Sequence, residues 1–219
     1  MAWFVRSSRN GVHMVYGQQA GKSCGIACVM MVNFKMKKWQ LAASLSSAPA
    51  GIAALPGIGY NVASAIKLES QVYAAYGKAT GKKYDGSADT FATQLPKVLN
   101  NLGIGVWTAE CYADRDLADT IIGSVGGADP APVILLVHWL NGGGHFVVCD
   151  TVVRAGAQTF MDICDPWDTA VRTVQITSGT PIAYDVNRAT DLIDLGQSHK
   201  DHNASAGDMD GWIIRRISR

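Results

Sequence analysis

The residue with the clearest capacity for chemistry is Cys24, which stands where a loop runs into an apolar, helix-like segment. A thiol is a weak nucleophile until it loses its proton, and its ordinary pKa is about 8.5. The unpaired N–H groups and the dipole at the start of a helix favour the thiolate. Gly25 would let a substrate backbone come close. Cys24 is therefore a candidate nucleophile, although taken alone it would be better explained as a buried structural thiol.

A catalytic thiol needs an imidazole that holds the thiolate and protonates the leaving amine. His145 opens a predicted strand directly after the glycine turn 141–144, which would expose its ring at a sheet edge. Asp165 follows one strand later, and its carboxylate would orient the ring across an antiparallel pair. The side-chain amide of Gln18 and the backbone N–H of Cys24 would together form an oxyanion hole.

Two of these residues have rivals nearby in the sequence. His138 lies inside an apolar strand-like run, and alternation from His145 does not settle which ring faces the cleft. We favour His145 because it follows a glycine turn. Gln19 competes with Gln18 for the oxyanion role, and its spacing from the cysteine makes Gln18 the better candidate.

The remaining polar candidates near the predicted site are weaker. Asp150 and Asp162 are alternatives for the orienting carboxylate. Asp165 itself could be a turn residue that ends a strand before a proline. Cys28 lies one helical turn beyond Cys24, and a small core residue is a better explanation for it than a metal-binding cysteine pair.

The hydrophobic pattern predicts helices in the first half of the chain and strands in the second. Helical periodicity covers Cys24–Lys37 with Ser23 as its N-cap, Asn61–Gly77, Asp89–Leu102 with Pro96 in its middle, and Asp114–Ile122. Strand-like runs cover Gly105–Ala109, Val133–Leu140, His145–Arg154, Gln158–Cys164, Ala170–Ile176 and Trp212–Ile217. The polar segment Gly196–Gly211 is expected to be a mobile loop. This order of elements predicts an α+β fold.

The composition indicates an ordinary globular protein. The chain has 219 residues, 48% hydrophobic and 17% charged, with a formal net charge of +1. This charge gives no general reason to expect binding to nucleic acid or to an anionic membrane. The sequence also shows no apolar stretch long enough to span a bilayer and no secretory signal, so we expect a soluble protein. Five scattered cysteines do not form a disulfide framework pattern.

Three segments resemble the bacteriocin-processing double-glycine leader peptidases, which are papain-like enzymes. Gln18 and the run Cys24–Val32 resemble the nucleophile segment of that family. Pro132–Trp139 followed by His145–Val148 resembles its histidine segment, and Asp162–Pro166 resembles its aspartate segment. The order of glutamine, cysteine, histidine and aspartate is the same. Together the motifs cover roughly residues 17–176 with one large interruption.

The resemblance implies a papain-like fold, in which an N-terminal helical part carrying Cys24 packs on a mostly antiparallel C-terminal sheet carrying His145 and Asp165. It implies peptide-bond hydrolysis by these three residues, with Gln18 in the oxyanion hole and with no metal or other cofactor. The preference of the family for double glycine would favour small substrate residues. Acyl transfer, deamidation and leader-peptide cleavage are alternatives that use the same residues.

We expect one peptidase domain over residues 1–219, with a helical insertion at about 40–86 and a C-terminal extension at about 177–219. Because the sequence contains no exporter, it is similar to stand-alone bacterial papain-like effector and toxin proteases. The expected substrate is a protein, docked on the insertion, and an immunity or inhibitor protein is a further expected partner. Such an enzyme would be made in the bacterial cytoplasm and delivered into a target cell by a secretion system.

Two further segments carry weaker hypotheses. Leu55–Ile66 resembles the hairpin of helix-hairpin-helix modules, whose glycine N–H groups contact DNA phosphates, but a Pro/Gly loop leading into a helix is the better explanation. His199 and His202 could form a metal site with the acidic residues Asp201, Asp208 and Asp210, but this segment is polar and is expected to be loose.

Overall fold

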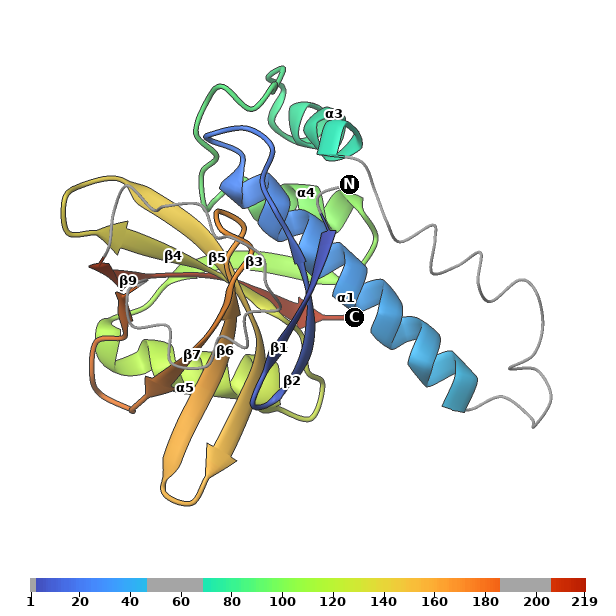
Figure 1. The fold of residues 1–219 in the computed structure, drawn as a ribbon. Helices are drawn as coiled ribbons and strands as arrows, with labels where there is room; N and C mark the ends of the chain where they lie inside the picture. The colour runs from blue at the N-terminus through green and yellow to red at the C-terminus, as the bar shows by residue number, and fades with distance from the viewer. Residues whose placement is uncertain (1–2, 47–68, 186–205) are drawn as a thin grey trace.

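The computed structural model describes residues 3–46, 69–185 and 206–219, and these fold around one large antiparallel sheet (Figure 1). Its strands are β3 (Val106–Cys111), β4 (Val133–Trp139), β5 (Gly144–Ala155), β6 (Gln158–Cys164), β7 (Val171–Ile176), β8 (Ala183–Asp185) and β9 (Ala206–Ser218). The order across the sheet is β3-β9-β4-β5-β6-β7, and β8 pairs with β9 off this path. Every neighbouring pair is antiparallel.

Helices pack on both faces of this sheet. α1 (Cys24–Ser46) packs against β5 and β4 and is accompanied by α4 (Leu95–Asn101) and α3 (Glu69–Thr80). α5 (Asp114–Gly126) packs against β5, β9 and β4 from the other side (Figure 1). This combination of helices with a large antiparallel sheet confirms the predicted α+β class.

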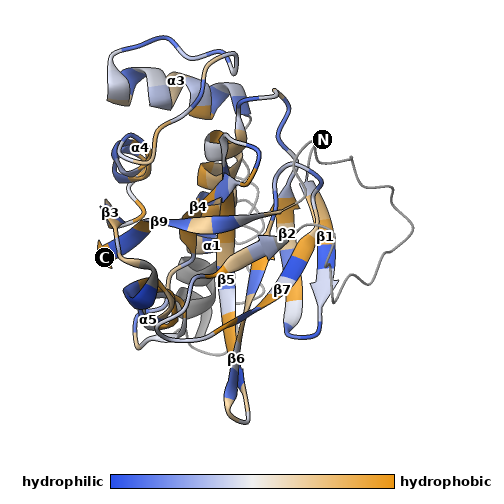
Figure 2. Ribbon diagram, turned by 90° about the vertical axis from the view of Figure 1, so that its left-hand side faces the viewer, coloured by the Kyte–Doolittle hydropathy of each residue, from blue (hydrophilic) through white to orange (hydrophobic). Residues whose placement is uncertain are grey.

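The strands in the middle of the sheet are apolar on both faces, because helices cover both. Ile134 of β4 and Ile214 of β9 lie in the core cluster that contains α1. Their sequence neighbours Leu135 and Ile213 face the other side of the sheet and lie in the cluster that contains α5. This alternation follows from the two-residue repeat of a strand. Figure 2 shows the hydrophobic residues concentrated on α1 and along these strands.

A two-stranded hairpin precedes α1 and was not predicted from the sequence. Its strands are β1 (Trp3–Ser8) and β2 (Gly11–Tyr16). Buried polar groups attach it to the large sheet: Ser8 Oγ donates to Asp162 Oδ2 at 2.6 Å, and His13 Nδ1 lies 2.9 Å from Asp150 Oδ1. Burial lowers the pKa of His13, but hydrogen bonds with Asp162 and Cys164 outweigh burial and raise it to about 9. The hairpin is therefore held through a charged, buried contact.

Several predicted element boundaries differ from those observed. The first helix begins at Cys24 as predicted but continues to Ser46. The helix predicted over Asp89–Leu102 begins only at Leu95, because Pro96 belongs in a first helical turn. The loop predicted over 196–211 was wrong from Ala206 onward, where β9 begins. The segments 47–68 and 186–205, which include Leu55–Ile66, lie outside the described residues.

The expected C-terminal extension, 177–219, supplies a strand inside the sheet. β9 lies between β3 and β4 and pairs with both, and Ile213 and Ile214 in its middle are fully buried. Within the expected insertion, 40–86, the described parts are the last turns of α1, the whole of α3 and the loop residues 81–86. No helix in the described parts of the chain has the length and apolar character needed to cross a membrane.

The position of β9 predicts that two isoleucines of that strand contribute very differently to the free energy of unfolding. Ile214 is fully buried, whereas Ile217 is 54% exposed. Ile214→Ala should lower the free energy of unfolding by about 2–5 kcal/mol because it leaves a cavity in the core. Ile217→Ala should change it by less than about 1 kcal/mol. Urea denaturation of both variants measures this, and equal effects would contradict the central position of β9.

Candidate active site

Cys24 is the first residue of α1, and the loop before it is hydrogen-bonded to the turn between β6 and β7. The hydroxyl of Ser23 donates to the carbonyl of Ala20, and the N–H of Ala20 approaches the same hydroxyl at 3.2 Å. The backbone N–H of Gln18 donates to the carbonyl of Pro166 at 2.8 Å. This last bond joins the nucleophile loop to the turn that carries Asp165. Cys24 itself is partly exposed, as a nucleophile must be.

His145 lies at the start of β5, beside Cys24. Both residues line one cavity of about 210 Å³. The ring's Nε2 lies 2.8 Å from Asp165 Oδ1, which leaves Nδ1 for the thiol. Burial lowers the pKa of the imidazole, but Asp165 and a hydrogen bond with Cys24 outweigh burial and raise it to about 10. The ring of Trp139 stacks on His145 with 5.8 Å between centroids, which shields the imidazole on one face.

Asp165 is fully buried and receives hydrogen bonds from four directions. Besides His145, the phenol of Tyr184 donates to its Oδ2 at 2.6 Å, and Arg172 Nη1 donates to the same oxygen at 3.2 Å. The backbone N–H of Trp167 donates to its Oδ1 at 2.8 Å. These donors stabilise the charged carboxylate and fix its position relative to the imidazole.

Sequence reasoning missed Tyr184 and Arg172. Arg172 offered a weak signal, since it is a charged residue inside a predicted strand. Tyr184 offered none, because β8 has only three residues and lies in the segment that was considered an extension. Only the folded sheet brings both groups to Asp165.

Gln18 is buried in the loop before Cys24, and its amide nitrogen donates to the backbone of that loop. Nε2 lies 3.0 Å from the carbonyl oxygen of Ala20 and 3.3 Å from that of Gly21. Its carbonyl oxygen has no hydrogen-bond partner among the described residues. Gln18 therefore shapes the loop in this structure, and its oxyanion role stays a prediction. Gln19 is exposed.

A larger cavity of about 440 Å³ opens on the other side of Cys24. Lys22, Cys24, Asp89 and Gly144 line both this cavity and the smaller one, so the two form one cleft across the thiol. The larger cavity is bounded by apolar side chains contributed by the loop before α4, by β4, by β5 and by β9: Phe91, Ala92, Leu136, Phe146 and Trp212. A peptide in this cleft would place an apolar side chain there.

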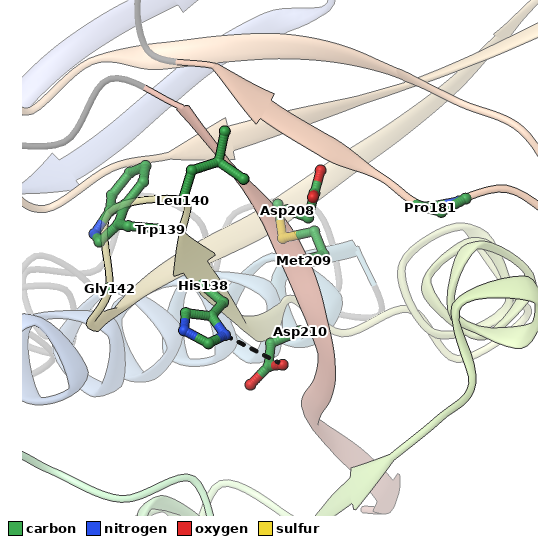
Figure 3. Close-up of a pocket in the computed structure, with 8 residues that line it drawn as sticks. All are labelled: His138, Trp139, Leu140, Gly142, Pro181, Asp208, Met209 and Asp210. Carbon is green, nitrogen blue, oxygen red and sulfur yellow. Dashed lines mark ion pairs between the residues drawn. The ribbon is translucent and has the colours of Figure 1, made fainter.

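His138, the rival base, lies in a different cavity. This cavity has a volume of about 500 Å³, and Figure 3 shows the His138 ring directed at Asp210. The two side chains are exposed and 3.9 Å apart. Trp139 and Gly142 line both this cavity and the small one beside Cys24. His138 is thus near the cleft, and its observed partner is a surface carboxylate.

The other rivals also lie apart from the imidazole of His145. Asp150 and Asp162 both contact His13. Cys28 is fully buried in the core, and burial raises its thiol pKa well above the ordinary value. Of the residues suggested for a metal site in the C-terminal part, Asp208 and Asp210 line the cavity of Figure 3, whereas His199, Asp201 and His202 lie outside the described residues.

Comparison with known proteins yields a match among the solved structures. No family model and no curated protein matches the chain. Among solved structures, the crystal structure of the Pseudomonas avirulence protein AvrPphB is similar at 15% sequence identity. The match covers 73% of this chain and 80% of that chain, with a TM-score of 0.28.

The packing beside Cys24 predicts that Gly25 tolerates no side chain. A Cβ there would collide with the hydroxyl of Thr90 and lie 3.2 Å from the ring of Phe146. Gly25→Ala should therefore destabilise the protein by about 1–3 kcal/mol. Gly21→Ala, where nothing lies within 4 Å of an added Cβ, is the matched control and should have little effect.

A second substitution identifies the cause of this cost. The Thr90 hydroxyl is buried with no hydrogen-bond partner among the described residues, so Thr90→Ala alone should be nearly neutral. In the Thr90→Ala background, Gly25→Ala should cost clearly less than in the wild type. Thermal unfolding of the four variants measures the coupling, and additive effects would show that the collision does not decide the outcome.

Proposed function

We propose that the protein is a papain-like cysteine endopeptidase with Cys24 as its nucleophile, His145 as its acid–base group and Asp165 as the orienting carboxylate. The observation that supports this most is the connected series of these side chains. The thiol and the imidazole share a cavity, and Nε2 of the imidazole lies 2.8 Å from a fully buried carboxylate oxygen. An imidazole held between a thiol and a carboxylate suits acyl chemistry.

In the proposed reaction, the Cys24 thiolate attacks the scissile carbonyl while His145 carries the proton as an imidazolium. The backbone N–H of Cys24 and the amide of Gln18 then stabilise the oxyanion, which requires Gln18 Nε2 to exchange a backbone carbonyl for the substrate. His145 protonates the leaving amine and subsequently takes a proton from the water that releases the acyl group. Asp165 keeps the ring aligned through both steps.

The substrate in this proposal is a specific protein, and the enzyme is a bacterial effector or toxin domain that acts in a target cell. The segment around 40–86 would contribute to docking of that substrate. The same three residues also serve acyl transfer and deamidation, so the products of the reaction distinguish these from hydrolysis.

Labelling with an epoxide inhibitor of cysteine peptidases tests the nucleophile. Cys24 should react at least about 100-fold faster than Cys111, an exposed thiol of the same chain. His145→Ala should reduce the Cys24 rate by about 100-fold or more and leave the Cys111 rate unchanged. Peptide mapping by mass spectrometry measures both rates in one sample.

Equal labelling of Cys24 and Cys111, or labelling of Cys24 that does not respond to His145→Ala, would rule out the proposed site. If the site is reactive, new N-termini that appear in a cell extract with wild type but not with Cys24→Ala identify the substrate. Hydrolysis of a peptide bond creates such termini, whereas deamidation or transamidation of a glutamine side chain releases only ammonia and does not.

The larger cavity predicts a preference for a bulky apolar side chain next to the scissile bond, in place of the small residues that the family resemblance implies. Phe91 stands at its rim and is 60% exposed. Phe91→Ala should raise KM for such peptides by about 10-fold and leave kcat nearly unchanged, because it removes binding that substrate and transition state share. Val106→Ala, which shortens another exposed apolar side chain on β3, should change neither. A preference for glycine at every position of a peptide library would contradict this.

A further inference from the structure

A second histidine-centred group of side chains lies outside the cleft. His13 of β2, Asp150 of β5 and Cys164 of β6 are all buried, and one ligand atom of each lies within 4.8 Å of the others. We call these three residues the His13 cluster. Cys164 Sγ donates to Asp150 Oδ2 at 3.5 Å, and His13 Nδ1 lies 2.9 Å from Asp150 Oδ1. Nitrogen, oxygen and sulfur donors therefore converge from three strands.

The other ring nitrogen of His13 is held by a second carboxylate. His13 Nε2 lies 3.3 Å from Asp162 Oδ2 and 3.1 Å from Ser8 Oγ. Asp162 is itself fixed by Asn10 Nδ2 at 2.9 Å and by Thr173 Oγ1 at 2.7 Å. A carboxylate on the outer nitrogen is the arrangement that orients metal-binding histidines and sets their tautomer.

Two carboxylates on opposite sides of the His13 ring favour a positive charge between His13 and Asp150. With the Nε2 proton donated to Asp162, Nδ1 directs either a lone pair or a second proton at the Asp150 carboxylate. A lone pair facing a buried carboxylate is unfavourable. The position is therefore filled either by a proton on Nδ1 or by a cation that both Nδ1 and Asp150 bind.

Charge neutrality is the same for both fillings. Without metal, the charges of protonated His13 and of Lys35, which is ion-paired with Asp150, balance the charges of Asp150 and Asp162. A divalent cation that displaces one proton from His13 and one from the Cys164 thiol leaves this sum unchanged. The exchange thus adds no uncompensated charge to the interior, where such a charge is costly.

We propose that the His13 cluster binds a thiophilic divalent cation, for which zinc is the best fit, through His13 Nδ1, an Asp150 carboxylate oxygen and Cys164 Sγ. This donor set suits zinc, whose fourth position would be taken by water. The bound ion would join the β1–β2 hairpin to β5 and β6. Its nearest electrostatic competitor is the Lys35 ammonium, whose side chain is 11% exposed. Lys35 pairs with Asp150 Oδ2 and can stay there while the ion takes Oδ1, the oxygen that faces His13 Nδ1.

A catalytic alternative at the same place is excluded by access. Ser8, His13 and Asp150 are arranged in the order of a hydrolase triad, with 3.1 Å between Ser8 Oγ and His13 Nε2. However, Ser8 is buried and its hydroxyl donates to Asp162, so it offers neither a free nucleophile nor room for a substrate.

Titration with cobalt, a spectroscopic substitute for zinc, tests this site in the full chain. The Cys24→Ala variant serves as the parent, because it removes the exposed thiol beside His145 that could also bind a metal. About one equivalent of cobalt should produce a sulfur-to-cobalt charge-transfer band, and zinc should abolish the band by displacement. Adding Cys164→Ser should remove it. Adding Cys149→Ser, which alters a buried thiol on the neighbouring strand that donates to the Thr151 carbonyl, should leave it intact.

Absence of the band in Cys24→Ala, or its persistence with Cys164→Ser, would overturn the proposal. If circular dichroism shows that Cys164→Ser does not fold, Lys35→Met decides instead. This change keeps the aliphatic stem and removes the competing ammonium, so cobalt should bind about 10-fold more tightly or better. An affinity that is unchanged or weaker would also overturn the proposal.

Discussion

The buried carboxylate of Asp165 is the constraint on which the cleft depends. A fully buried carboxylate costs several kcal/mol unless charged and hydrogen-bonding partners compensate for its lost hydration. Here the partners are His145, Arg172, Tyr184 and the N–H of Trp167. Three of them come from other strands, so the folded state is favoured only when β5, β7 and β8 hold their observed positions. The imidazole of His145 is therefore placed by the stability of the fold itself.

The same constraint extends to the nucleophile through the backbone. The turn after β6 accepts a hydrogen bond from the N–H of Gln18 at its Pro166 carbonyl. Helix α1, which starts at Cys24, packs on β5, and His145 is the second residue of that strand. Two rigid elements and one turn thus set the distance between thiol and imidazole. Gly25 is required at this contact, because Thr90 and Phe146 fill the space that a side chain would need.

Local patterns in the sequence predicted the positions at which single elements begin. Cys24 at the start of a helix and His145 at the start of a strand follow from hydrophobic periodicity and from a glycine turn, and both occur as predicted. Long-range features were not accessible in this way. The place of β9 between β3 and β4 depends on pairings with strands that are distant in the sequence. For the same reason Tyr184 could not be assigned to Asp165. The β1–β2 hairpin is a local feature, and its turn signal, Asn10-Gly11, was missed because the alternation of the flanking residues is weak.

Two buried imidazole–carboxylate pairs occur among the described residues, and their surroundings differ. His145 lies beside a partly exposed thiol and two connected cavities, so a proton on it can reach a substrate. His13 is enclosed by Asp150, Asp162 and Lys35, and its only thiol neighbour, among the described residues that contact it, is the buried Cys164. Cys164 and Asp165 are adjacent in sequence yet serve different histidines. A histidine with a strongly shifted pKa therefore indicates a reactive site only when a substrate can reach its ring. Substrate access is what distinguishes the cleft at Cys24 from the cluster at His13.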